Sequence, residues 1–259
     1  MSNQTCKQSN EDLVNIKICS NFQIKIHDSW SNFWDNENNK EKVKEIFNKI
    51  RENYFPKKEN IFRFMQNDLT QIKCIIIGMD PYPSCYEENG TCIPHATGRS
   101  FEVAGLKSWQ DTINPSLLNI IKALHYDETR KKISIDEIRK ECEGFRLPDK
   151  SWFDETEEQG VLWLNAALTV KQGQVGSHME HWEKFMNEVF VYINQENPNA
   201  LWCLWGKKAQ KRVLNAIKID ETKCIYSSHP RFRKFICENC FQTITEKTGI
   251  NWIYFLHTK

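Results

Sequence analysis

The 259-residue sequence lacks a long apolar run and lacks an amino-terminal hydrophobic segment of the kind that directs secretion. We therefore expect no membrane partner and an intracellular location, in the cytoplasm or, in a eukaryote, in the nucleus. The sequence also lacks an excess of charge of either sign, because 35 Lys and Arg residues balance 34 Asp and Glu residues. A nucleic-acid surface would have to come from local basic clusters, for which residues 207–212 and 231–234 are the candidates.

A cysteine pattern typical of a metal site is also lacking, although the chain holds ten cysteines. Cys237 and Cys240 have the spacing of one ligand pair, but no convincing second pair accompanies them. Cys85 and Cys92 lie seven residues apart in an expected loop. We therefore expect no metal, no cofactor, and reduced thiols of which several are buried.

Two regions differ in composition. Residues 1–25 are polar and rich in Asn, Gln and Ser, so we expect a poorly ordered, flexible extension there. Residues 26–259 would form a single domain, and its core can be large because hydrophobic residues make up 40% of the chain.

Four short apolar runs have the length and composition of buried strands. They are residues 74–77, 161–164, 201–205 and 224–226. Segments of helical length separate them, which predicts an α/β fold with a parallel sheet and helical crossovers. Asp80, Asn165 and His229 follow three of these runs. They would meet at one edge, because parallel strands share a carboxyl edge and open α/β sheets bind ligands there.

The motifs around these residues resemble the uracil-DNA glycosylase family, over about residues 26–255. The resemblance is carried by residues 78–83 (Gly-Met-Asp-Pro-Tyr-Pro), 99–103, 114–120, 160–165, 204–210 and the pair His229-Pro230. It implies a three-layer α/β/α fold with a central four-stranded parallel sheet. It also implies a monofunctional DNA glycosylase, which hydrolyses the N-glycosidic bond of a flipped-out uracil and leaves an abasic site in base excision repair.

The chemistry of that bond cleavage suits the residues at the predicted edge. The sugar becomes cationic as the base departs as an anion, so a carboxylate such as Asp80 can stabilise the cation and activate water. His229, as a neutral imidazole, can donate a hydrogen bond to the base O2. The Asn165 carboxamide offers one donor and one acceptor, which complement uracil O4 and N3–H.

Other base contacts follow from the resemblance. Phe101 would stack on the base, and Tyr82 would stand against C5 and exclude the thymine methyl. Met79 replaces the family's usual Gln and would act through its backbone. Taken singly, Phe101 and Tyr82 are more typical of packing residues and Asn165 of a turn cap. Their joint occurrence in matching motifs favours the functional interpretation.

The resemblance also implies a monomer that contacts both duplex and single-stranded DNA. The expected contacts are Pro83, Ser116, Ser228, Arg231, Phe232 and Arg233. Ser116 also begins a predicted helix over residues 116–124 as its possible N-cap. The family's duplex-inserting Leu corresponds to Arg233, as in poxvirus members, and Phe232 is a competing wedge.

Two alternatives stay open. Residues 83–100 make a longer loop than the family usually has, and loops carry specificity. The loop favours removal of a modified pyrimidine, such as glucosylated hydroxymethylcytosine from phage DNA in antiviral defence, whereas Tyr82 and Asn165 oppose it. The other alternative is a non-catalytic DNA-binding module, against which the intact Asp80, Asn165 and His229 argue.

Overall fold

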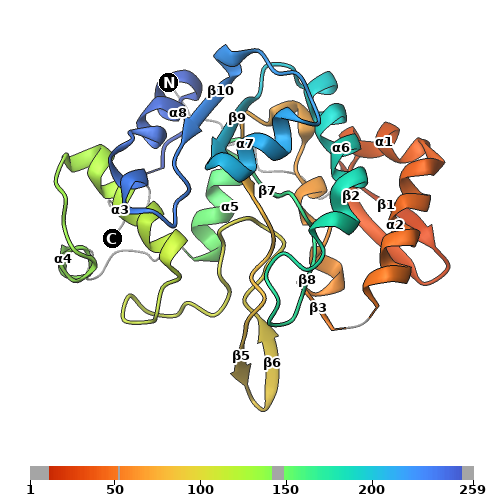
Figure 1. The fold of residues 1–259 in the computed structure, drawn as a ribbon, viewed down its shortest axis with the longest axis horizontal. Coiled ribbons are helices and arrows are strands. Elements are labelled where there is room, and N and C mark those ends of the chain that lie inside the picture. The colour runs from red at the N-terminus through yellow and green to blue at the C-terminus, as the bar shows by residue number, and fades with distance from the viewer. Residues whose placement is uncertain (1–11, 52, 142–148, 253–259) are drawn as a thin grey trace.

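A four-stranded parallel sheet forms the centre of the molecule (Figure 1). The computed structural model describes residues 12–51, 53–141 and 149–252. The strands lie in the order β10 (Cys224–Ser227), β9 (Leu201–Trp205), β4 (Cys74–Gly78) and β7 (Val161–Asn165). Each neighbouring pair is parallel, so the carboxyl ends of all four strands lie at one edge.

Helices cover both faces of this sheet (Figure 1). One face packs against α1 (Ser31–Asp35), α2 (Glu37–Ile50), α6 (Met179–Glu196) and α7 (Lys207–Leu214). The other face packs against α3 (Pro115–Thr129), α4 (Ile135–Glu141), α5 (Lys150–Glu158) and α8 (Cys240–Thr248). Successive strand residues alternate between the two cores, as Ile75 and Ile76 do. The predicted three-layer α/β/α fold is confirmed.

The amino-terminal segment differs from the prediction. β1 (Leu13–Cys19) and β2 (Phe22–His27) form an antiparallel hairpin. Phe22, Ile24 and Ile26 alternate inward and are buried in the core beside α2. The expectation of a poorly ordered extension over residues 1–25 is therefore wrong for residues 13–25. The physical reason is the alternation of apolar side chains along β2, which gives the hairpin a face to bury. Residues 1–11 lie outside the described residues.

The long loop after Tyr82 also differs from the prediction. β5 (Cys85–Glu88) and β6 (Thr91–Pro94) form a second hairpin, which protrudes from the body of the molecule (Figure 1). Asn89 and Gly90 make its turn with positive φ angles of 52° and 73°, and an Asn-Gly pair favours such turns. A disulfide joins Cys85 to Cys92. The expectation of reduced thiols is therefore wrong for this pair, whereas the other six described cysteines are free.

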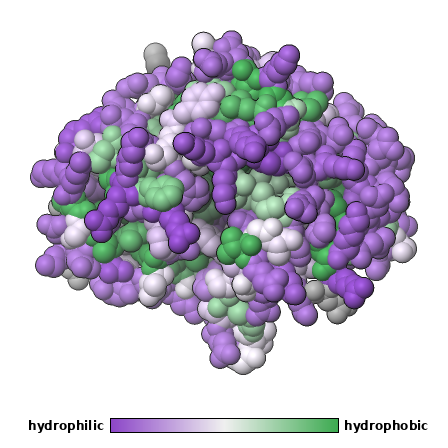
Figure 2. Space-filling view, viewed as in Figure 1, coloured by the Kyte–Doolittle hydropathy of each residue, from purple (hydrophilic) through white to green (hydrophobic). Residues whose placement is uncertain are grey.

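A further short pair of strands and the polar surface complete the description of the fold. A two-stranded antiparallel pair, β3 (Tyr54–Phe55) with β8 (Val170–Lys171), lies beside the base of the protruding hairpin (Figure 1). The visible face is mostly hydrophilic, with apolar side chains showing between the polar ones (Figure 2). None of the described helices is long and apolar enough to cross a membrane.

Candidate active site

A cleft of about 1210 Å³ lies at the carboxyl edge of the central sheet. Asp80, Asn165 and His229, which follow β4, end β7 and follow β10, all line it. The structure thus brings together three residues that are far apart in the sequence. The amino-terminal ends of α3 and α7 border the same cleft, through Asn114–Ser116 and Gly206–Lys208.

Asp80 is a half-buried carboxylate held by the backbone. Its Oδ2 accepts a 2.6 Å hydrogen bond from the N–H of Gly176, in the loop between β8 and α6. Burial raises the pKa of Asp80, and the Gly176 N–H and the nearby Lys208 ammonium oppose this rise without cancelling it. The hydrogen bond from the Gly176 N–H thus fixes the orientation of the carboxylate.

The buried Asn165 side chain occupies space that its strand neighbour, a glycine, leaves open. Asn165 pairs with Gly78 in the β4–β7 register. A Cβ at position 78 would lie 2.4 Å from the Asn165 Oδ1 and 2.6 Å from the Ser100 Cβ. Among the described residues, no group hydrogen bonds the Asn165 carboxamide, although its side chain lines the cleft. Its donor and acceptor are therefore available to a ligand.

His229 presents one defined nitrogen. Its Nδ1 accepts a 3.0 Å hydrogen bond from the N–H of Arg231, so the proton of the neutral ring lies on Nε2. Burial lowers the pKa of His229, and the charges of Arg231 and Lys208 lower it further. The imidazole is therefore neutral at pH 7. Gly206 permits its close approach, since a Cβ there would lie 2.8 Å from the His229 Cβ.

Aromatic residues line the same cleft. The Phe101 ring centroid lies 6.2 Å from that of His229, and Phe101 has a φ of +63°. Tyr82 also lines the cleft, and burial raises the pKa of its hydroxyl. Met79 packs its side chain against the core, and its carbonyl accepts a 2.9 Å hydrogen bond from the N–H of Ala167. Met79 therefore borders the cleft through its backbone.

A buried ionic cluster supports the segment before Phe101. The Arg99 guanidinium contacts the carboxylates of Glu102, Asp154 and Glu157, and only 3% of its side chain is exposed. Burial lowers the pKa of Arg99, but the neighbouring carboxylates, Glu157 foremost, raise it by more. The cluster ties this segment to α5 and so fixes the backbone that carries Phe101.

Five of the six residues expected to contact DNA line the cleft. Pro83, Ser116, Ser228, Arg231 and Phe232 line the cleft, whereas Arg233 is not part of its wall. Phe232 is 62% exposed, which is unusual for a Phe.

Two of the predicted serines have partners that the sequence did not indicate. The N-cap of α3 is Asn114, whose Oδ1 accepts the Ser116 N–H at 3.0 Å, so the expectation of a Ser116 cap is wrong. Both the N–H and the hydroxyl of Ser228 donate to Glu238.

Sequence analysis missed several residues of the cleft. The sequence places Lys207 and Lys208 in a candidate nucleic-acid surface but does not indicate that Lys208 lies near both Asp80 and His229. Gly176 acts through its backbone N–H, which carries no signal in the sequence. Glu238 lines the cleft from between Cys237 and Cys240, a pair whose spacing gives no sign of this role.

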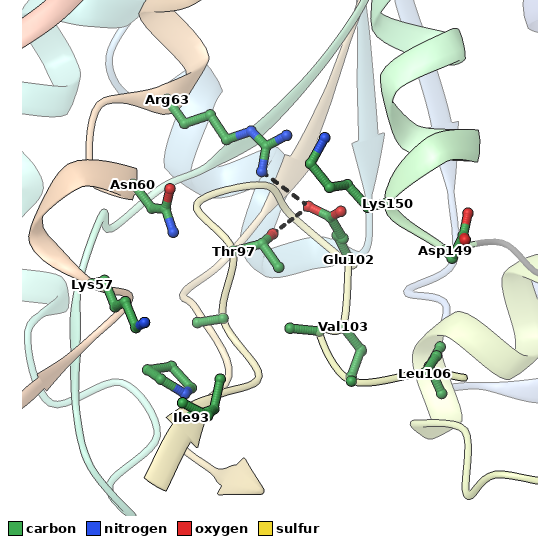
Figure 3. A pocket seen from close by; sticks show the side chains of 14 residues that line it. Lys57, Asn60, Arg63, Ile93, Thr97, Glu102, Val103, Leu106, Asp149 and Lys150 are labelled. Carbon is green, nitrogen blue, oxygen red and sulfur yellow. Dashed lines mark hydrogen bonds and ion pairs between the residues drawn. The ribbon is translucent and has the colours of Figure 1, made fainter. Parts of the chain in front are cut away.

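A second cavity, of about 460 Å³, shares no lining residue with the cleft (Figure 3). Its Glu102 carboxylate already has partners, because Arg63 lies 3.8 Å from it and Thr97 donates a hydrogen bond to it (Figure 3). Within the described part of the chain, no cluster of three His, Cys, Asp or Glu side chains could hold a metal ion. The cleft at the sheet edge is therefore the candidate site.

Comparison with known proteins identifies the family. No protein-family model matches the chain. The uracil-DNA glycosylase of Flavobacterium johnsoniae is 32% identical over 218 residues, which cover 81% of this chain and 85% of that protein. The chain belongs to the uracil-DNA glycosylase family. Uracil-DNA glycosylase 2 of Bacteroides fragilis is 29% identical over 250 residues, covering 89% of this chain and all of that protein.

Solved structures share the fold of this chain. Mimivirus uracil-DNA glycosylase superposes with a TM-score of 0.59 at 24% identity, over 78% of this chain and 68% of that one. The UNG of Nitratifractor salsuginis superposes with a TM-score of 0.61 at 16% identity, over 86% of this chain and 92% of that one.

Proposed function

We propose that this protein is a monofunctional DNA glycosylase that hydrolyses the N-glycosidic bond of a flipped-out uracil and leaves an abasic site in DNA. Membership of the family supports the reaction and the base. The observation that carries the assignment is the convergence of Asp80, Asn165 and His229 in one cleft. This set supplies a carboxylate, a neutral hydrogen-bond donor and an amide, as the reaction requires.

Asp80 and His229 stabilise the two charges that develop. With Oδ2 held by Gly176, Asp80 directs its other oxygen toward the sugar or the attacking water. His229 donates Nε2–H to the base O2, since its Nδ1 is occupied by the Arg231 N–H. A neutral donor suits this task because it stabilises the departing anion without first being charged.

Base selection follows from the walls of the cleft. Asn165 pairs with uracil O4 and N3–H through a carboxamide that has no other partner among the described residues. Phe101 stacks on the base, and Tyr82 closes the space next to C5. Met79 contributes backbone to this wall. A thymine methyl at C5 would meet the Tyr82 ring.

DNA binding uses the rim of the cleft. Pro83, Ser116 and the start of α7 approach phosphates, where helix amino-terminal ends and Lys208 favour negative charge. Arg231 adds a further cation. Phe232, which lines the cleft and is 62% exposed, is the wedge that fills the vacated stack on duplex DNA, and Arg233, next to it in the chain but outside the cleft wall, is the competing candidate. The protein works as a monomer on duplex and single strands.

The position of the disulfide-bonded hairpin favours uracil over a bulky modified pyrimidine. Of the residues in the long loop, Pro83 and Ser84 line the cleft, but β5 and β6 do not contribute to its wall. The additional length therefore does not enlarge the space next to C5.

The test is a panel of duplexes that carry uracil, thymine, hydroxymethylcytosine or its glucosylated form, incubated in the presence of a chelator. Alkali then cleaves the abasic sites. We expect strand breaks with uracil alone. Breaks with the glucosylated base and none with uracil would overturn the proposal, and DNA binding without any breaks would favour a non-catalytic module.

A further inference from the structure

Glu238 has a dense set of hydrogen bonds next to the catalytic histidine. It follows the short 3-10 helix of residues Arg233–Cys237. Its carboxylate accepts hydrogen bonds from the Ser227 hydroxyl at 2.6 Å, the Ser228 N–H at 2.5 Å and the Ser228 hydroxyl at 2.7 Å. The two serines directly precede His229 in the chain, so Glu238 fixes the segment from which His229 extends.

This contact closes a loop. Ser228 and Glu238 are ten residues apart, and the residues between them include His229 and the exposed Phe232. Within the loop, the Phe232 N–H donates to the His229 carbonyl at 2.9 Å. The buried Asn119 side chain donates to the Pro230 carbonyl at 2.7 Å. Asn119 thus holds the loop directly after His229, whereas Glu238 holds the point where it leaves β10.

A carboxylate at this place works against DNA binding. Glu238 lines the same cleft as Lys208 and Arg231, where phosphates are expected. Its ion pair with Lys234, at 3.6 Å, involves a lysine side chain that is 81% exposed, and such pairs contribute little. The three hydrogen bonds to Ser227 and Ser228 are therefore the main interactions of the Glu238 carboxylate.

We propose that Glu238 is a positioning residue, which holds the His229 loop by clasping Ser227 and Ser228 and so directs the His229 Nε2–H at the base. The role of His229 in excision rests on the proposed function. The clasp occupies both donors of Ser228, so Ser228 acts on DNA through the shape of the loop and not by donating to a phosphate.

The kinetic test compares Glu238→Ala with Glu238→Gln under single-turnover and steady-state conditions on a uracil-containing duplex. Glu238→Ala should lower kcat by up to about 100-fold, because a displacement of about 1 Å at a reacting group can cost that much. Its KM should not rise, since a repulsive charge is removed. Glu238→Gln should retain kcat, because its amide oxygen accepts from the Ser228 N–H and its NH₂ can donate to a serine hydroxyl. The exposed Glu246→Ala is the matched control.

Two results would overturn the clasp: wild-type kcat in Glu238→Ala, or an equal loss of kcat in both variants. A substrate-free measurement separates this proposal from the proposed function. Amide hydrogen exchange at Ser228 and Arg231 should speed up in Glu238→Ala and stay slow in Glu238→Gln, with thermal unfolding showing that both are folded. Unchanged exchange in Glu238→Ala would also contradict the clasp, whether or not the protein excises uracil.

Discussion

At the scale of single residues, two opposite pKa shifts act in one cleft. Burial raises the pKa of the Asp80 carboxyl from its ordinary 3.8 and lowers that of the His229 imidazole from its ordinary 6.5. Desolvation disfavours the charged form of each group, which explains the opposite directions. The mechanism needs Asp80 ionised and His229 neutral, so both shifts bear on the acid limb of the pH profile.

The pH dependence of kcat/KM follows from these directions. Activity is lost as pH falls, when Asp80 gains a proton or His229 becomes charged. We expect protonation of Asp80 to reduce activity at a pH above 3.8, because its pKa is raised, and protonation of His229 to do so at a pH below 6.5, because its pKa is lowered. An acid limb above pH 7 would contradict a neutral His229. The measurement is the initial rate of abasic-site formation across this pH range.

Tyr82 gives a prediction about base choice. Tyr82→Ala should open space next to C5 and so permit slow removal of thymine, while Tyr82→Phe keeps the ring and should still exclude it. The ratio of thymine to uracil excision, measured on matched duplexes, reports the change. No thymine removal by Tyr82→Ala would mean that another group occupies the space next to C5.

At the scale of elements, the ends of strands and helices build the site. Gly78 at the end of β4 leaves room for Asn165 at the end of β7, and Gly206 before α7 leaves room for His229 after β10. Asn165 is the last residue of β7, so the sheet itself places it, whereas Asp80 and His229 lie in the segments that directly follow β4 and β10.

The loop after β10 presents an aromatic side chain outward, which leads to a prediction about duplex DNA. Phe232→Ala should reduce excision from duplex DNA by about tenfold, or about 1.4 kcal/mol, because filling a vacated stack offsets part of the unstacking cost of a few kcal/mol. Excision from single strands should change little. An equal loss on both substrates would instead indicate that Phe232 contacts a phosphate. If Arg233→Ala loses more activity on duplex DNA than Phe232→Ala does, Arg233 is the wedge.

At the scale of the whole molecule, the sequence predicted the sheet well and the surface poorly. The runs that became β4, β7 and β9 are buried on both faces, so continuous apolar segments identified them, whereas the edge strand β10 leaves Tyr226 46% exposed. The two hairpins were missed because polar composition outweighed the alternation of Phe22, Ile24 and Ile26 and the Asn-Gly turn signal.

The sequence predicted those residues of the candidate site whose side chains take part in the reaction, but not the groups that hold them in place. Asp80, Asn165 and His229 are placed by strand ends that the sequence reveals. Gly176 contributes a backbone N–H, and Glu238 reaches its partners only after the chain has folded. Such contacts join segments distant in the sequence and have no local pattern. The monomeric state, the cellular compartment and the absence of a metal stay predictions.

The most direct test of the account is the single-turnover rate of abasic-site formation from a uracil-containing duplex, for the wild type and Asp80→Asn, with chelator present. Asp80→Asn keeps the shape of the side chain and the hydrogen bond from Gly176 but removes the charge. The account predicts a rate lower by about 10²–10³-fold, or about 2.7–4 kcal/mol, with an unchanged thermal unfolding midpoint. A near-normal rate in Asp80→Asn would contradict the assignment of Asp80 and, with it, the catalytic cleft.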